Sequence, residues 1–267
     1  MGKIIFMIMI ALLFLLPYYW MIIISLEPEA LGINPNFRFA PKDMTFDNYT
    51  FLFFKVKSFY RWIFNSLFIS IIATILTCIS ALMAGYILAK RKFPGNRILF
   101  LIFLSSIAIP RDILLLPRYI LMKDLHLLNT YPSMFIMAMS GAFGVFLMKQ
   151  IIQTIPDEII ESSMIDGASE WQILYYIVLP MVKPGLIALG IFTFVGTYND
   201  YFWHLLMVQN VSMRTLPLAV GTFVTDWEPK FQLTMAAAFI ASLPLLILFF
   251  IFYKNFLKGI TIGGVKG

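Results

Sequence analysis

The stretch that decides this sequence is Glu161-Ser162-Ser163-Met164-Ile165-Asp166-Gly167, with Ile177-Val178-Leu179-Pro180 a short distance after it. It is a polar, acidic segment set between apolar runs long enough to cross a membrane. Asp157 and Glu158 suit the positively polarised start of a helix, and Pro156 suits its first turn, where a missing N–H is not needed. The pattern therefore predicts a short helix that ends near residue 166.

Two further signals predict a second helix directly after the first. Gly167 suits a chain that leaves a helix with positive φ, a conformation that is costly for residues with a Cβ. Ser169-Glu170-Trp171-Gln172 has the pattern of a capping box, in which the first and fourth side chains satisfy each other's backbone N–H groups. We therefore expect two short helices joined by a tight turn, within a cytoplasmic segment over residues 153–180.

The composition indicates a membrane protein independently of this segment. Apolar residues make up 60% of the chain, charged residues only 13%, and the mean hydropathy is +0.86. A soluble chain usually has about a quarter charged residues. The net charge of +6 is modest and fits membrane-flanking Lys and Arg, so no nucleic-acid partner is expected. Cys78 is the single cysteine, and with only His126 and His204 besides, neither a disulfide nor a metal site is expected.

Apolar runs predict six membrane spans in one domain over residues 1–267. A helix needs about 20 residues to cross the hydrocarbon core. Three charge-free runs satisfy this directly, and three others are interrupted by polar residues near one end. The expected spans are residues 4–26, 62–89, 98–116, 131–149, 184–207 and 231–253. The fold class is therefore an all-α, polytopic membrane protein, and the first run is too long for a secretory signal.

The distribution of positive charge predicts that both termini are cytoplasmic. Residues 90–97 form one short turn with four positive charges, and short loops weigh most in setting orientation. This orientation places segments 28–60 and 208–228 outside the membrane. The C-terminal tail over residues 259–267 is then cytoplasmic.

Missing motifs exclude several chemical roles. The sequence has no G-x-x-x-x-G-K-[ST], so the chain does not itself cradle ATP phosphates. It also has no G-x-S-x-G and no metal-ligand cluster. We expect a transport subunit that is not an enzyme and binds no cofactor, and whose energy comes from another subunit.

The spacing in the decisive stretch resembles the EAA loop of ABC importer permeases, E-A-A-x-x-x-G-x9-I-x-L-P. Glu161, Gly167, Ile177 and Leu179-Pro180 fall at matching positions, and Ser162-Ser163 replaces the two alanines. In that family the loop docks the membrane subunit on its ATPase. The resemblance implies that the ATPase-coupling residues are Glu161, Ser162, Ser163, Asp166, Gly167, Ala168, Leu179 and Pro180.

Further fragments narrow the resemblance to carbohydrate importers related to the maltose transporter, in particular to their shorter permease. The family patterns "NY-x-F", "NS" and "aaYalar-x-kFpG" match Asn48-Tyr49-Thr50-Phe51, Asn65-Ser66 and residues 84–95. The family's C-terminal "G-x-t-x-GavKG" matches residues 259–267. By this resemblance the residues that contact the ATPase from the tail are Gly263, Gly264, Val265, Lys266 and Gly267.

One family pattern is altered in the fifth span. "WNdf-x-x-P" corresponds to residues 198–204, with Tyr198 in place of Trp and His204 in place of Pro. The resemblance makes Tyr198, Asn199, Asp200 and Trp203 candidates for the translocation path. An equally weighted alternative is that Asp200 caps a helix end near the membrane boundary, although intramembrane acids are default functional candidates.

The resemblance implies a complete assembly with the type I ABC importer permease fold. Its partners would be a second homologous permease, two ATPase subunits that hold ATP and Mg, an extracellular sugar-binding protein, and membrane lipid. The expected location is the plasma membrane of a prokaryote, and the expected cargo is a carbohydrate. Alternatives are an ABC importer for a polyamine or a phosphonate, a secondary transporter, which would need ion-coupling groups and often repeats, and a membrane enzyme.

Overall fold

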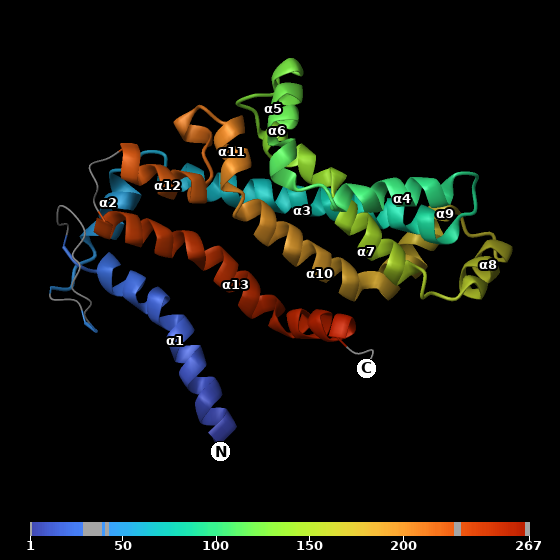
Figure 1. The fold of residues 1–267 in the computed structure, drawn as a ribbon, viewed down its shortest axis with the longest axis horizontal. Coiled ribbons are helices and arrows are strands. Elements are labelled where there is room, and N and C mark those ends of the chain that lie inside the picture. Colours follow the sequence, from blue (N-terminus) through green and yellow to red (C-terminus); the bar gives the residue numbers. More distant parts are fainter. Residues whose placement is uncertain (1, 29–38, 41–42, 227–230, 265–267) are drawn as a thin grey trace. The chain divides into compact units, whose positions relative to one another are not determined.

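The computed structural model describes residues 2–28, 39–40, 43–226 and 231–264. Within these ranges every regular element is helical (Figure 1). The chain divides into two compact units. Unit 1 comprises residues 1–66 and 209–247, and unit 2 comprises residues 67–208 and 248–267. The helices α3 (Phe59–Lys90) and α13 (Phe231–Gly264) each contribute to both units.

Unit 1 is built around an apolar core from four helices. Its elements are α1 (Gly2–Ser25), α2 (Asp47–Phe54), the start of α3, η4 (Val211–Met213), α12 (Leu216–Asp226) and the start of α13. Burial of apolar area drives this packing. The buried core residues are Leu52, Val56, Phe59, Trp62, Leu216, Ala219, Leu233, Ala236, Ala237 and Ile240.

Polar side chains on the first turns of α3 hold the loop that leads into α12. Trp62 Nε1 donates to the carbonyl of Val211 at 2.6 Å. Asn65 Nδ2 donates to the carbonyls of Ser212 and Arg214 at 3.0 and 2.9 Å. Ser66 Oγ accepts from the backbone N–H of Leu216 at 2.6 Å. The "NS" fragment of the sequence therefore satisfies loop backbone groups that would otherwise be buried without partners.

A second tie joins α2 to the end of α1. Asn48 Nδ2 donates to the carbonyls of Ser25 and Glu27 at 2.9 and 2.8 Å, and the hydroxyls of Tyr49 and Ser25 are 2.6 Å apart. The "NY-x-F" fragment thus fixes where the chain returns after the first span.

Unit 2 contains the remaining helices. They are α4 (Asn96–Ile107), η1 (Arg111–Leu114), α5 (Leu115–Asp124), α6 (Tyr131–Phe135), η2 (Ile136–Ser140), α7 (Ala142–Ile152), α8 (Asp157–Ile165), α9 (Glu170–Gln172), the π-helical η3 (Ile173–Val178), α10 (Leu179–Tyr198) and α11 (Tyr201–Met207). Helix α7 packs against both α4 and α10. Gly85 on α3 lets α7 approach closely, because a Cβ there would lie 2.7 Å from the Met148 Cβ.

Among the described residues, five helical segments are long and apolar enough to cross a membrane. They are Gly2–Ser25, Phe59–Lys90, Tyr131–Ile152, Glu170–Tyr198 and Phe231–Tyr253. A sixth crossing requires the pair Asn96–Ile107 and Arg111–Asp124, which is bent by 99°. The all-α, polytopic fold class expected from the sequence is confirmed.

Three spans differ from the straight helices expected. The run over residues 131–149 consists of α6, the 3-10 helix η2 and the start of α7, with Gly141 in an extended conformation between η2 and α7. The run over residues 98–116 stops being one helix after Ile107, because Pro110 disfavours a helical conformation in the residue before it. The run over residues 184–207 divides after Tyr198, where Asp200 Oδ1 accepts from the Trp203 N–H at 3.1 Å and caps α11. The helix of that span also begins earlier than expected, inside the predicted coupling segment.

Candidate functional site

The first helix of the predicted coupling segment is α8, and it lies at the end of unit 2 where α3 ends and α4 begins (Figure 1). Asp157 and Glu158 occupy its first turn as expected, while Pro156 precedes it at the N-cap position. Ile160 is buried, whereas Glu161 and Ser162 on α8 are exposed. Helix α8 therefore packs through one apolar face and presents its acidic and hydroxyl side chains outward.

The turn after α8 requires glycine for its backbone conformation. Gly167 has φ +83°, and a Cβ built on it would meet no atom within 4 Å. The N–H of Ala168 donates to the Ser163 carbonyl, and the N–H of Gly167 donates to the Met164 carbonyl, both at 3.0 Å. This pair of bonds is the Schellman ending of a helix. The positive φ predicted for Gly167 is confirmed.

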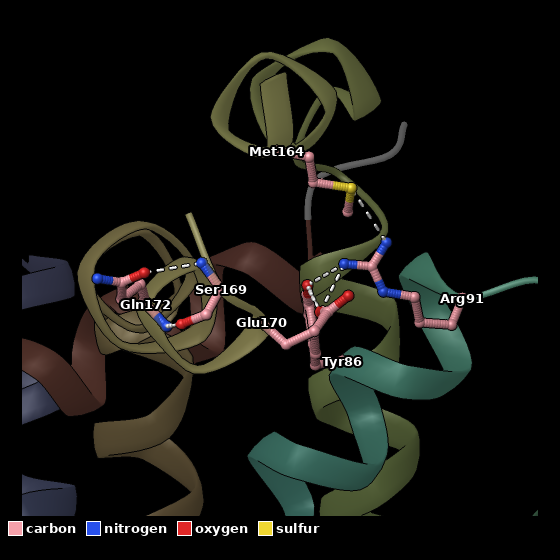
Figure 2. Close-up of polar contacts among 6 residues, drawn as sticks. All are labelled: Tyr86, Arg91, Met164, Ser169, Glu170 and Gln172. Carbon is pink, nitrogen blue, oxygen red and sulfur yellow. Dashed lines mark hydrogen bonds and ion pairs between the residues drawn. The ribbon is translucent and has the colours of Figure 1, made fainter. Parts of the chain in front are cut away.

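The second helix begins with the predicted capping box. The backbone N–H of Ser169 donates to Gln172 Oε1 at 2.7 Å, and the backbone N–H of Gln172 donates to Ser169 Oγ at 3.4 Å (Figure 2). Both halves of the box satisfy N–H groups that a helix start leaves without partners. The first short helix, the tight turn and the start of the second helix therefore follow from local sequence signals. The second helix is not short as expected, because it continues through η3 and α10 to Tyr198.

Polar contacts attach this segment to the C-terminal end of α3. Lys90 Nζ donates to Asp157 Oδ1 at 2.6 Å and to the carbonyl of Ile155. Arg91 Nη2 donates to Glu170 Oε2 and to the Tyr86 hydroxyl, both at 2.6 Å (Figure 2). The Tyr86 hydroxyl in turn donates to Glu170 Oε2 at 2.8 Å. Two of the four positive charges in the turn over residues 90–97 are therefore committed to structural contacts.

The hydrogen bond from Lys90, and then its positive charge, hold the pKa of the Asp157 carboxyl below its ordinary value. A lowered pKa means that this contact is present when Asp157 is ionised and is lost only as the pH falls through that pKa. The Lys90 side chain is 3% exposed and the Asp157 side chain is 71% exposed. The contact is thus intact throughout the neutral pH range.

An apolar cluster anchors the same segment from beneath. Its members come from the segment itself and from α3, α7 and α10. The buried residues are Ala81, Tyr86, Met148, Ile152, Ile155, Ile160, Ile173, Leu174, Val178, Val182 and Leu189. Burial of this area, at about 25 cal/mol per Å², outweighs the contribution of the partly exposed ion pairs. The segment is therefore a packed part of unit 2.

The opposite side of the segment exposes large apolar side chains. Ile165 is 86% exposed, Trp171 66% and Tyr176 71%. A hollow next to the turn is lined by Asp166, Gly167, Ala168, Gln172, Tyr176 and Ile177. Exposed aromatic residues beside a concave surface are typical of protein–protein contacts. The sequence reasoning missed Trp171 and Tyr176. The available signal for Trp171 is an aromatic residue between Glu170 and Gln172, whereas Tyr176 lies in the apolar run over residues 173–179 and has no such signal.

The predicted coupling residues divide between two surfaces. Asp166, Gly167 and Ala168 line the hollow, and Glu161 and Ser162 are exposed nearby on α8. Ser163 is half-buried and donates to the carbonyl of Ile159 at 2.6 Å. Leu179 and Pro180 instead line a separate, mainly apolar groove formed by residues of α3, η3, α10 and α13. The structure thus brings the α8 turn together with η3, but it does not place Leu179 and Pro180 in the same hollow.

The predicted path residues are mostly engaged in packing. Tyr198 is 2% exposed and its ring stacks on Phe194 with centroids 6.0 Å apart. Trp203 is buried, and its Nε1 donates to the carbonyl of Ser133 at 3.0 Å. Asp200 caps α11, while Asn199 is exposed. In the tail, Gly263 and Gly264 end α13, and Val265, Lys266 and Gly267 lie outside the described residues.

The fold and this site together define a class of protein. Long apolar helices form a polytopic membrane protein, and a packed helix–turn–helix segment carries an exposed hollow beside large apolar side chains. Among the residues that the structure describes, no group of three or more His, Cys, Asp or Glu could hold a metal ion.

The chain belongs to the family of binding-protein-dependent transport system inner membrane components, which it matches over residues 81–262. It is thus a permease subunit of an ABC importer, a transport component and not an enzyme, and the family expected from the coupling-segment spacing is confirmed.

Individual relatives match over nearly their full length. The chain is 33% identical to the arabinooligosaccharides transport system permease protein AraQ of Bacillus subtilis, over 98% of this chain and 94% of the relative. It is 28% identical to the diacetylchitobiose uptake system permease protein DasC of Streptomyces coelicolor, over 94% and 91%. The fold matches a chain in the crystal structure of a bacterial alginate-importing ABC transporter with TM-score 0.80 and 20% identity, covering 95% of this chain and 94% of that one.

Proposed function

We propose that this chain forms, with a second homologous permease, the membrane path for an oligosaccharide or sugar derivative. The observation that carries the proposal is the near full-length similarity to the arabinooligosaccharide and diacetylchitobiose permeases. The family match, which spans residues 81–262, includes the whole coupling segment. A polyamine or phosphonate importer would share the coupling-segment spacing, but neither solute is named for these relatives.

In this proposal two separate ATPase subunits bind ATP and Mg and dock on the α8 turn. The exposed residues Ile165, Trp171 and Tyr176 and the hollow at Gly167 support this role, because an apolar surface beside a concavity favours a protein partner. The tail residues Gly263 to Gly267 would lie against the same ATPase pair. Closure of the ATPases would rock the helices between inward-open and outward-open states.

The extracellular binding protein would contact segments 28–60 and 208–228. The proposed location is the plasma membrane of a prokaryote, with both termini in the cytoplasm. Two observations support the orientation. The turn over residues 90–97 carries four positive charges, and Lys90 and Arg91 of that turn contact the coupling segment.

Uptake measurements test the cargo. In the native host, deleting this chain is expected to abolish uptake of at least one of two labelled probes, arabino-oligosaccharides or diacetylchitobiose, the sugars named for the two relatives. Uptake should return when the intact chain is supplied again. Spermidine and a phosphonate serve as the comparison probes. Loss of spermidine or phosphonate uptake alone, with all sugar uptake retained, would contradict the carbohydrate proposal.

Cysteine labelling tests the orientation. In a Cys78→Ser background, Ser162→Cys on α8 should resist an impermeant thiol reagent in intact cells and react after the membrane is opened. Lys57→Cys, which is exposed between α2 and α3, should react in intact cells. Both positions are exposed in the chain, and expressing it without ATPase subunits keeps Ser162 uncovered, so accessibility of the side chain does not decide the result. Labelling of Ser162→Cys from outside would overturn both the orientation and the coupling role.

A further inference from the structure

Two consecutive residues at the end of α3 hold the two halves of the coupling segment. Lys90 contacts Asp157 at the start of α8, and Arg91 contacts Glu170 at the start of α9, each at 2.6 Å. Gly167 lies between these two attachment points. The segment is therefore tied to the same membrane helix on both sides of its turn.

Arg91 has the larger share of these contacts. Its guanidinium lies 5.3 Å from the centre of the Tyr86 ring, and its Nη1 lies 3.9 Å from Met164 Sδ on α8 (Figure 2). Glu170 Oε2 accepts from both Arg91 and Tyr86, two donors carried by α3 or its immediate end. A carboxylate oxygen that accepts hydrogen bonds from two donors is restrained in its direction from α3 as well as in its distance. Arg91 thus links α3, α8 and α9 in one polar network.

The covalent connection between the coupling segment and α10 contains two features that make a helix easier to bend. It passes through the π-helical stretch η3, and Pro180 and Pro184 lie in the first two turns of α10 that follow. Proline has no N–H to donate, so the helical hydrogen-bond ladder lacks these two donors. Sharp bends in helices occur at prolines and at π-helical insertions. A displacement passed along the backbone alone would be partly absorbed there.

We propose that Arg91 and Glu170 are positioning residues that make α3 move with the coupling segment as one body when the ATPase subunits close. The inference rests on the proposed docking of ATPases on this segment. With the pair intact, a displacement of α8 and α9 reaches α3 directly and α10 through η3. Without the pair, the start of α9 loses its polar tie to α3, and the displacement reaches α3 only through the Lys90–Asp157 contact and the apolar cluster.

The pair is suited to positioning because it contributes little to folding. The Arg91 side chain is 28% exposed and the Glu170 side chain is 57% exposed. Partly exposed ion pairs stabilise proteins only weakly, and the apolar cluster beneath the segment does not include either residue. Loss of the pair should therefore leave the chain folded and inserted while changing how motion is transmitted.

Charge reversal in the assembled importer tests the inference. For a probe sugar that the wild type transports, Arg91→Glu should lower uptake about tenfold while ATP hydrolysis continues, a change within the usual range of coupling between sites. The swapped pair Arg91→Glu with Glu170→Arg should restore uptake to within about threefold of the wild type, because the Tyr86 hydroxyl can accept as well as donate. Arg97→Glu is the matched control, since it reverses an exposed charge in the same turn and should leave uptake unchanged.

A second measurement reports whether Arg91 holds the coupling segment against the end of α3, and it does not depend on transport. Spin labels at Lys92 and Glu161, both exposed, in a Cys78→Ser background should give a narrow distance distribution. The Arg91→Glu substitution should broaden this distance distribution, and the swapped pair should make the distribution narrow again. The inference would be overturned if Arg91→Glu left both uptake and the distance distribution unchanged. It would also be overturned if the swapped pair did not restore them. A wild-type chain that recruits no ATPase subunit would instead overturn the proposed function, while the distance measurement would still report on the attachment.

Discussion

Replacing Gly167 with aspartate is expected to abolish solute uptake while the chain remains inserted at normal abundance. At φ +83° a residue with a Cβ is strained by about 1 kcal/mol. The new carboxylate would also stand beside Asp166 in the hollow where we propose that the ATPase docks. No atom lies within 4 Å of the added Cβ, so the packing of unit 2 has no clash to relieve. The measurements are membrane abundance, ATPase association and uptake of the transported probe.

Gly95→Asp is the matched control for this prediction. Gly95 has φ +86°, and a Cβ there also meets no atom within 4 Å. The backbone strain is therefore the same, but Gly95 lies in the turn between α3 and α4, outside the coupling segment. Gly95→Asp should retain ATPase association and most of the uptake. An equal loss of uptake in both variants would mean that backbone strain alone causes the defect. Wild-type uptake in Gly167→Asp would rule out this turn as the place where the ATPase subunits drive the permease.

Replacing Gly85 with leucine is expected to reduce the amount of folded chain, whereas Gly167→Asp should leave that amount unchanged. A Cβ on Gly85 would lie 2.7 Å from the Met148 Cβ and 3.0 Å from the Lys149 backbone nitrogen. These atoms belong to the body of α7, so no side-chain rotation relieves the contact. Overpacking of this kind costs about 1–3 kcal/mol, and here α3 and α7 must separate. We expect much lower abundance in the membrane and a lower temperature of aggregation in detergent.

Gly196→Leu is the control for Gly85→Leu. It places the same side chain on membrane helix α10, where an added Cβ meets no atom within 4 Å. Abundance of Gly196→Leu should match the wild type, which separates a local clash from a general effect of leucine in a membrane helix. Normal abundance of Gly85→Leu would contradict the close approach of α3 and α7.

Local sequence signals predicted the helix–turn–helix of the coupling segment because each depends on near neighbours. The positive φ at Gly167 and the capping box from Ser169 to Gln172 involve atoms within a few residues of each other. The breaks at Pro110 and Asp200 are also local. The helix cap that was one of the two interpretations of Asp200 is confirmed, whereas the run over residues 98–116 was expected to be a single span. Proline and side-chain capping outweighed apolar composition at both places.

The sequence by itself determined that this is a polytopic helical membrane protein with a helix–turn–helix segment at residues 157–172, because hydropathy and turn chemistry depend on contiguous residues. The ABC importer family was indicated by the resemblance of the spacing from Glu161 to Pro180, which is also contiguous in the chain. Only the tertiary structure decided what Tyr86, Arg91 and Glu170 do, because the hydrogen bond from Tyr86 to Glu170 joins residues 84 positions apart. It likewise separated Leu179 and Pro180 from the hollow at Gly167 and revealed the exposed face of Trp171 and Tyr176. Which side of a short helix is buried depends on the helices packed against it, and that packing is not a local property of the chain.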